Sequence, residues 1–364
     1  MEEWASLDAT NVQEETNPKR LLYEQGDYHP GSGDICPKYV ALSTSSVMRH
    51  PYYKYPALLD PGIMIALQSP EDPVIYPDDG QKLYMAECQD MELCPVRMFH
   101  QGLLTNEINL KYYGVNPKGV RAMANALKYN DYVKKFNLTD NFLSVDASYH
   151  LGDMLRSNST LVELNLSGCR IGPGGAKALL TGMVTNKTLR ALNLSKNKLG
   201  DPGVQIFANA IFNGLNIKMI NLSHNDISGT GIDYLSEAFE AYNNITHWDL
   251  SWNGLFSPGT YNFLVSMAET SKNLKKMDLS WNNLFGGRIG QGIKQLMGIK
   301  NLKHLNLSYN RLDGEAIKHI GLGLKKAKTL VTLNLSYNTM TPADAVLVVK
   351  KLLLKTRGPI NLAD

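Results

Sequence analysis

Three histidines, His224, His247 and His304, come closest to forming a catalytic or metal-binding group. They recur at similar phases of a sequence repeat, and His247 and His304 fall in one column two units apart. At the ~4.8 Å spacing of adjacent strands their rings would lie roughly 9–10 Å apart, too far to share a metal ion. The chain also lacks a phosphate-binding loop, a His-Glu-x-x-His motif and a Gly-x-Ser-x-Gly motif. We therefore expect no enzymatic activity, catalytic residue, cofactor or metal.

The four cysteines are also poor candidates for chemistry. Cys36, Cys88, Cys94 and Cys169 are too few for a disulfide scaffold, and the spacing of Cys88 and Cys94 does not suit a zinc knuckle. Cys169 occupies a position where neighbouring units carry a structural asparagine. We expect all four to be reduced thiols.

A column of aromatic residues points instead to binding. The residue at one phase of the repeat changes along the chain in the order Gly168, Lys196, His224, Trp252, Trp281, Tyr309 and Tyr337. Tryptophan and tyrosine aligned at an exposed phase are typical of interface anchors, whereas the alternative is that each ring packs over the neighbouring turn. We predict a protein-binding site formed by Trp252, Trp281, Tyr309, Tyr337, His247, Lys276 and His304.

The charge distribution favours an acidic partner for this site. Residues 270–364 contain 16 Lys and Arg but only 5 Asp and Glu, although the whole chain carries a net charge of only +3. Such a field attracts acidic segments. Nucleic acid is not favoured, because no known nucleic-acid-binding module and no basic-aromatic interleaving is present.

The scaffold for these residues is a repeat. An Asn-Leu or Asp-Leu pair recurs every 27 to 29 residues, at Leu110, Leu138, Leu166, Leu194, Leu222, Leu250, Leu279, Leu307, Leu335 and Leu362. A period of this length is typical of a solenoid. In each unit we expect a short strand, in which Leu192 and Leu194 point inward while Ala191, Asn193 and Ser195 face out. Trp248, at an inward leucine position, is predicted to be core.

A helix is expected to follow each strand. A capping residue and a proline mark the helix start four times, at Asn116-Pro117, Asp201-Pro202, Ser257-Pro258 and Thr341-Pro342. Apolar residues then recur at helical spacing. Stacked units would form a parallel sheet on the concave side and a row of helices on the convex side.

A column of asparagines falls where the chain leaves each strand. Its members are Asn141, Asn197, Asn225, Asn253, Asn282, Asn310 and Asn338, with Cys169 at one position. An amide side chain can both donate and accept, and so can satisfy backbone groups left unpaired in the turn. We predict a structural asparagine ladder that links successive units.

The pattern Leu189-x-x-Leu192-x-Leu194-x-x-Asn197-x-Leu199, with a full helix in each unit of about 28 residues, resembles the ribonuclease-inhibitor class of leucine-rich repeats. The stretch from Tyr84 to Gly119 is similar to the entry of the leucine-rich repeat-containing protein 74 group. The resemblance implies an α/β leucine-rich repeat solenoid, or horseshoe, that acts as a cytoplasmic adaptor. Members of this broad class occur in ciliary axonemes, so it also implies a ciliary setting.

Three segments are expected. Residues 1–78 form an extended arm rich in Pro and Tyr, since prolines remove backbone donors and disfavour helices and central strands. Residues 79–104 form capping helices, and residues 105–364 form nine repeats and the start of a tenth. The last unit stops before a helix, so we predict an open apolar edge at the C-terminus, bordered by Leu353, Ile360 and Leu362.

These features predict a protein-interaction scaffold with partners on the concave face, on the arm and at the C-terminal edge. We expect no membrane insertion, because a signal-like start and long apolar runs are missing. One alternative is a regulator of small GTPases, similar to the Ran GTPase-activating proteins, with Arg170 as the contact residue. Another, actin capping by a tropomodulin-like arm helix, is disfavoured by the prolines.

Overall fold

The computed structural model describes residues 76–241, 244–256, 258–353 and 361–363. The predicted arm lies outside the described residues, apart from its last three positions. The side chains of Leu353, Ile360 and Leu362 also lie outside them, and so does the predicted cap at Ser257.

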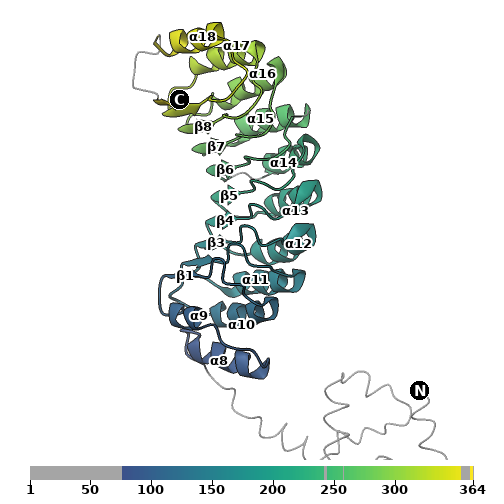
Figure 1. Cartoon of the computed structure of the whole chain (residues 1–364), viewed down its shortest axis with the longest axis vertical. Helices are drawn as coiled ribbons and strands as arrows, with labels where there is room; N and C mark the ends of the chain where they lie inside the picture. Colours follow the sequence, from purple (N-terminus) through teal and green to yellow (C-terminus); the bar gives the residue numbers. More distant parts are fainter. Residues whose placement is uncertain (1–75, 242–243, 257, 354–360, 364) are drawn as a thin grey trace, which may run out of the picture. The chain divides into compact units, whose positions relative to one another are not determined.

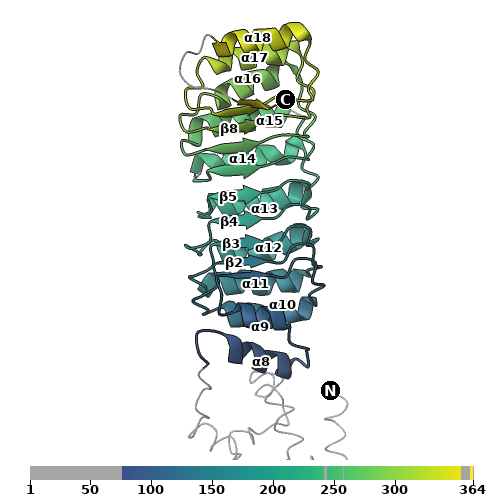
Figure 2. The same ribbon diagram turned by 60° about the vertical axis from the view of Figure 1, so that its left-hand side comes forward.

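Ten short strands form one parallel sheet in strict chain order (Figures 1 and 2). The strands are β1 (Glu107–Asn109), β2 (Lys135–Asn137), β3 (Glu163–Asn165), β4 (Ala191–Asn193), β5 (Met219–Asn221), β6 (His247–Asp249), β7 (Lys276–Asp278), β8 (His304–Asn306), β9 (Thr332–Asn334) and β10 (Asn361–Ala363). In β1 to β9 the middle residue is buried and the flanking two are more exposed, as expected for strands with one solvated face.

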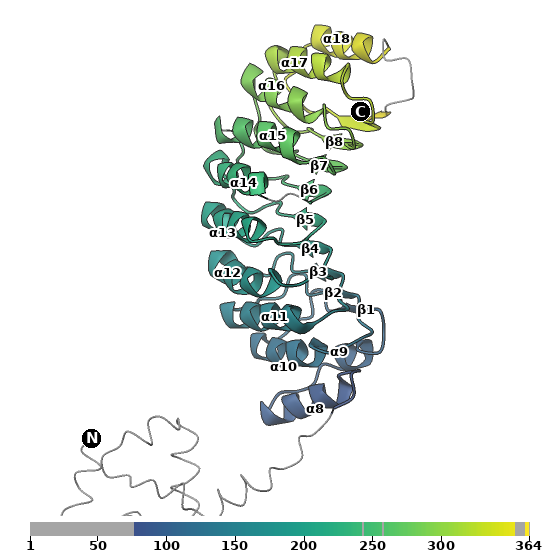
Figure 3. The same cartoon turned by 180° about the vertical axis from the view of Figure 1, so that it is seen from behind.

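A helix follows each of the first nine strands and covers one side of the sheet, whose other side lines the inner curve of the solenoid (Figures 1 and 3). These helices are α10 (Pro117–Leu127), α11 (Val145–Ser157), α12 (Gly172–Met183), α13 (Gly200–Phe212), α14 (Gly229–Ala241), α15 (Pro258–Thr270), α16 (Gly286–Leu296), α17 (Gly314–Leu324) and α18 (Pro342–Leu353). One buried apolar cluster runs between the two layers. Trp248 is part of this core, as predicted, and packs edge-on against Phe207, Phe239 and Phe263.

In the described part of the chain, two helices precede the first strand, α8 (Gln81–Asp90) and α9 (Arg97–Gly102). The rings of Tyr84 and Phe99 lie 4.6 Å apart, and Phe99 in turn contacts Phe136 of β2. The Tyr84 hydroxyl accepts a hydrogen bond from the Val96 amide, and burial raises the pKa of this tyrosine above its usual value. These contacts extend the apolar core beyond the first repeat.

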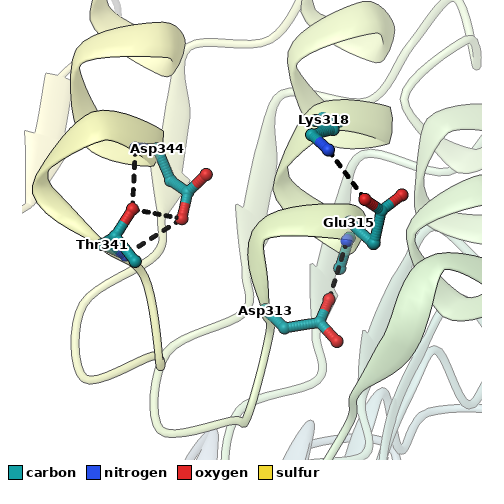
Figure 4. A network of polar contacts seen from close by, with 6 residues as sticks. Asp313, Glu315, Lys318, Thr341 and Asp344 are labelled. Carbon is teal, nitrogen blue, oxygen red and sulfur yellow. Dashed lines mark hydrogen bonds and ion pairs between the residues drawn. The ribbon is translucent and has the colours of Figure 1, made fainter.

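The helix starts vary more than the proline signals indicate. Asn116 caps α10 and Thr341 caps α18 as expected, while Asp313 caps α17 by accepting from the Ala316 amide (Figure 4). Asp201 is not a cap, because α13 begins one residue earlier. Its carboxylate instead accepts from the amide and hydroxyl of Ser228 in the next repeat. The Asp201 side chain therefore links two successive coils and does not cap its own helix.

Two further expectations are wrong. The serine after each strand does not face out: it is buried in five coils, at Ser195, Ser223, Ser251, Ser280 and Ser308. In the coil after β7, the Ser280 hydroxyl donates to Asp278. In β10, Leu362 pairs with Leu333 and not with Leu335, so it belongs to the middle-strand column. The Asn-Leu pair at Leu362 is thus not equivalent to the pair at Leu335, and the short interval between them does not reflect the repeat.

Candidate protein-binding site

The asparagine column links each coil to the one before it. Asn225 is fully buried, and its Oδ1 accepts from the amides of Asn197 and Leu199 at 2.9 and 3.4 Å. Its Nδ2 donates to the carbonyls of Leu194 and Ser223. Three of these four hydrogen bonds hold the turn of the preceding coil, and the bond to Ser223 fixes the turn of its own coil.

Asn141, Asn197, Asn253, Asn310 and Asn338 also bond into the preceding coil, but two rungs of the ladder differ. At Cys169 the thiol donates to the Leu138 carbonyl, and burial raises the pKa of Cys169 to about 12, so it is a structural thiol. At Asn282 the Oδ1 atom is buried without a hydrogen-bond partner. The Asn253–Asn282 interval is one residue longer than its neighbours, and Gly254 there bonds to Ile227 instead.

The residue before each ladder position adopts the left-handed backbone conformation throughout. We call these residues the turn column: Tyr112, Asp140, Gly168, Lys196, His224, Trp252, Trp281, Tyr309 and Tyr337 have φ between 54° and 69°. In the first eight, from Tyr112 to Tyr309, the amide donates to the carbonyl of a serine or threonine in the next coil. The repeated conformation and bond place the side chains of the column in register.

The last five side chains of the turn column form a continuous stack of rings. Centroids lie 4.7 Å apart for His224 and Trp252, 4.0 Å for Trp252 and Trp281, 4.0 Å for Trp281 and Tyr309, and 4.1 Å for Tyr309 and Tyr337. The interplanar angles are only 10° to 14°. Each inner ring therefore covers the faces of its neighbours, which agrees with the alternative that each ring packs on the next coil. The column nevertheless remains on the surface.

Exposure shows what the stack presents to a partner. Trp252, Trp281 and Tyr337 are 44%, 38% and 69% exposed, and His224 and Tyr309 are half-buried. Because the faces of the inner rings are covered, the accessible part is a row of ring edges. Ring edges carry partial positive charge and indole N–H groups donate, so the row suits carbonyl and carboxylate oxygens.

Sequence reasoning missed His224 as a member of this stack. It had been grouped with the other histidines as a potential ligand, although its register with Trp252 was visible in the repeat. In the structure, burial lowers the pKa of His224, and the positive charge of Lys196 lowers it further.

The other three predicted binding residues lie in a separate column. His247, Lys276 and His304 are the first residues of β6, β7 and β8 and pair in register along the sheet. Lys276 was expected beside Trp281, but it stands at the opposite end of its strand. His247 and Lys276 border a hollow of about 280 Å³ over β3 to β7. Burial, followed by the charges of Lys276 and Lys275, lowers the pKa of His247.

Arg170, the candidate for a GTPase contact, is also in the left-handed region, and its guanidinium lies 4.2 Å from the ring centroid of Phe142. It is therefore held against a ring of its own chain. Within the described residues there is no cluster of three or more histidine, cysteine, aspartate or glutamate side chains arranged to hold a metal. None of the described helices has the length and apolar character needed to cross a bilayer.

A family model described as "Leucine Rich repeat" matches residues 157–180, 185–208, 216–236, 299–321 and 326–348. Each match covers a strand, its turn and more than half of its helix, in agreement with the parallel sheet and the asparagine ladder. The fold is a leucine-rich repeat solenoid. The repeats that carry Trp252 and Trp281 fall outside the matched segments.

Three solved structures are similar to this leucine-rich repeat solenoid. Leiomodin-1 actin-binding site 2 shares 18% identity at a TM-score of 0.33, over 46% of this chain and 92% of that one. The TLR13–ssRNA13 complex shares 18% identity at a TM-score of 0.41, and the match covers 59% of this chain and 30% of that one. The ectodomain of the Arabidopsis receptor kinase HAESA, in complex with a peptide hormone, shares 19% identity at a TM-score of 0.38. This match covers 64% of this chain and 34% of that one. The solenoid thus spans only about a third of each receptor chain.

Proposed function

We propose that this protein is a non-enzymatic interaction scaffold whose main binding surface is the stack formed by His224, Trp252, Trp281, Tyr309 and Tyr337. The observation that carries the proposal is that these rings occupy an exposed position whose backbone conformation disfavours bulky residues. Earlier coils use Asp140, Gly168 and Lys196 at the same position and make the same backbone hydrogen bond. The fold therefore does not require aromatics there.

The chemistry of the surface supports an acidic, partly apolar partner segment. Ring edges attract oxygen atoms, and residues 270–364, which carry three of the five rings, are strongly basic. Nine coils of turn column provide rigid support, so little ordering free energy is lost on the solenoid side when a partner binds.

Trp281→Ala tests this proposal, with Phe212→Ala as the matched control. Phe212 is 63% exposed at the end of α13 on the convex side, so its loss removes a ring outside the stack. Each protein is used as bait in cell extract, and the captured partner is then titrated by calorimetry. We expect Trp281→Ala to weaken binding by more than about tenfold and Phe212→Ala by less than about twofold.

Trp281→Ala is also expected to lower stability, by about 1–3 kcal/mol, because two stacking contacts are lost. Affinity is therefore measured well below the melting transition. Unchanged affinity of the folded variant would show that the rings only pack, and would overturn the proposal.

The ciliary setting is part of the proposal and is supported by the resemblance to the ribonuclease-inhibitor class and the leucine-rich repeat-containing protein 74 group. A cytoplasmic adaptor of this kind would place its arm and its C-terminal edge, as well as the concave face, in contact with other proteins of an axonemal assembly. A fluorescent fusion that is excluded from cilia in ciliated cells would remove this setting.

A further inference from the structure

A second surface lies at the opposite end of the strands from the ring stack. The residue just before each strand forms its own column, and five of its eight members between β2 and β9 are basic: Lys134, Val162, Arg190, Lys218, Thr246, Lys275, Lys303 and Val331. We call the basic members, together with Lys276, the basic rim. Since all strands are parallel, this rim runs along one edge of the sheet and the stack along the other.

Backbone hydrogen bonds hold the rim in register. The amides of Lys275 and Lys276 both donate to the Thr246 carbonyl, at 2.8 and 3.1 Å, and those of Lys303 and His304 donate to the Lys275 carbonyl at the same distances. In the same way, the amides of Lys218 and Met219 both donate hydrogen bonds to the Arg190 carbonyl. The rim residues therefore stand one strand spacing apart, about 4.8 Å, on a rigid support.

The positive charge of the rim is not neutralised within the described part of the chain. The one ion pair near it joins Lys135 to Glu163 at 3.7 Å, and Lys218 donates to the Asn244 carbonyl. Lys134, Lys275, Lys276 and Lys303 are exposed. Lysines in adjacent coils repel one another, so an anionic ligand along the rim relieves an unfavourable interaction.

The carboxylates on the sheet confine such a ligand to the rim. Asp249 and Asp278 are neighbours at the ends of β6 and β7, where they accept hydrogen bonds from Ser251 and Ser280 and from the amide side chains of Asn221 and Asn306. They would repel an anion placed over the middle of the sheet. An acidic polypeptide is favoured over nucleic acid, because the inner rings of the stack have no free faces for bases.

The spacing of the rim charges specifies the ligand further. Arg190 and Lys218 form one pair in adjacent coils, Lys275 and Lys303 form another, and Thr246 stands between them. The centres of the two pairs are three strand spacings apart, roughly 14 Å, which is the length of about four residues of extended chain. We propose that the basic rim binds an extended acidic segment of a partner protein with two acidic pairs about four residues apart.

This inference rests on the proposed scaffold function, but its test is independent of the native partner. The probe is a fluorescein-labelled peptide with two Glu-Glu pairs about four residues apart in a Ser/Thr background, compared with a peptide of the same composition whose glutamates are contiguous. Anisotropy titrations use the full chain, the double variant Lys275→Gln/Lys303→Gln and the charge-matched control Lys325→Gln/Lys326→Gln at the end of α17.

At low ionic strength we expect the spaced peptide to bind at least about threefold more tightly than the contiguous one. The rim variant should weaken binding by about tenfold, the control by less than about twofold, and the difference should shrink at high salt. The peptide carries no apolar side chain for the ring stack, so its titrations report on the rim, whereas capture of the native partner by Trp281→Ala reports on the stack, and the two proposals can fail separately.

Three results would overturn the inference. Equal loss in the rim and control variants would show a diffuse field and no site. Equal affinity for the spaced and contiguous peptides would remove the predicted register. If an oligouridylate bound more tightly than the spaced peptide, and this binding depended on Lys275, the rim would be a nucleic-acid surface.

Discussion

The two halves of the turn column share one backbone and differ only in side chains. In the N-terminal half, Tyr112 is followed by Asp140, Gly168 and Lys196, with no adjacent rings, whereas every position of the C-terminal half from His224 onward carries a ring, although bulky side chains are disfavoured at a positive φ. The amides of Asp140 and Trp281 nevertheless donate to serine carbonyls at 2.7 and 3.1 Å in the same way. Repeated backbone geometry therefore leaves this position free to be chosen for what it presents to solvent.

The energies point the same way. A non-glycine residue in the left-handed region costs about 1 kcal/mol, and a stacked aromatic pair returns about 0.5–1.5 kcal/mol. The two terms are of similar size, so the stacking contacts roughly offset the backbone strain that every non-glycine residue of the column carries. Selection for binding explains five aligned rings better than selection for stability does.

The largest expected effect concerns the ladder that gives both halves the same backbone. Asn225→Ala removes four hydrogen bonds and leaves the buried amides of Asn197 and Leu199 unsatisfied, so we expect a loss of about 3 kcal/mol in the free energy of unfolding. Asn282→Ala, where Oδ1 has no partner, should cost about half as much. Urea denaturation measures both. Equal losses would mean that the irregular coil is held as tightly as the regular ones.

An intermediate effect is expected when the stack is extended into the N-terminal half. Lys196 precedes His224 in the turn column, so Lys196→Phe adds a ring next to the imidazole and should raise the free energy of unfolding by about 0.5–1 kcal/mol. Lys198→Phe is the control, because Lys198 also has a positive φ but lies outside the column. Thermal denaturation that shows the same change for both variants would indicate a general gain from added apolar surface.

The smallest effect concerns the end of the stack at His224. Its pKa is lowered in the folded state, chiefly by burial, so the folded protein binds fewer protons there than the unfolded chain. The stabilising contribution of the neutral ring is thus complete above the unfolded pKa of about 6.5 and decreases as the pH falls toward the folded pKa. His224→Gln removes this dependence, so the difference in stability between wild type and variant should narrow as the pH falls below about 6.5 in equilibrium denaturation series. If the difference in stability between wild type and His224→Gln did not change with pH, the predicted role of His224 would be wrong.

Several features were predictable from sequence because they follow from the period alone. Each coil contacts only its neighbours, so a repeat of this length determines which residues share a column, and the buried middle-strand column with Trp248 follows directly. The asparagine column could be assigned for the same reason, since its amides must satisfy turns that recur in every unit.

The departures arise where two coils compete for one group. Alternation predicts that Ser195 faces solvent, but it is buried, and its hydroxyl lies 2.7 Å from the hydroxyl of Ser167 in the neighbouring coil. Asp201 had the position of a helix cap, but the amide and hydroxyl of Ser228 in the next coil are the donors it serves. Local propensity does not include such partners, because they are brought close only when the coils stack.

By itself, the sequence determined the solenoid, the columns from the first to the ninth repeat and the excess of positive charge toward the C-terminus, because these depend on residue type and spacing. Only the tertiary structure decided that the rings stack face to face with His224 at one end, and that Lys276 belongs to a different edge from Trp281. The physical reason is that side-chain direction depends on the backbone conformation of each turn and on the distance between coils, and neither is encoded in the period.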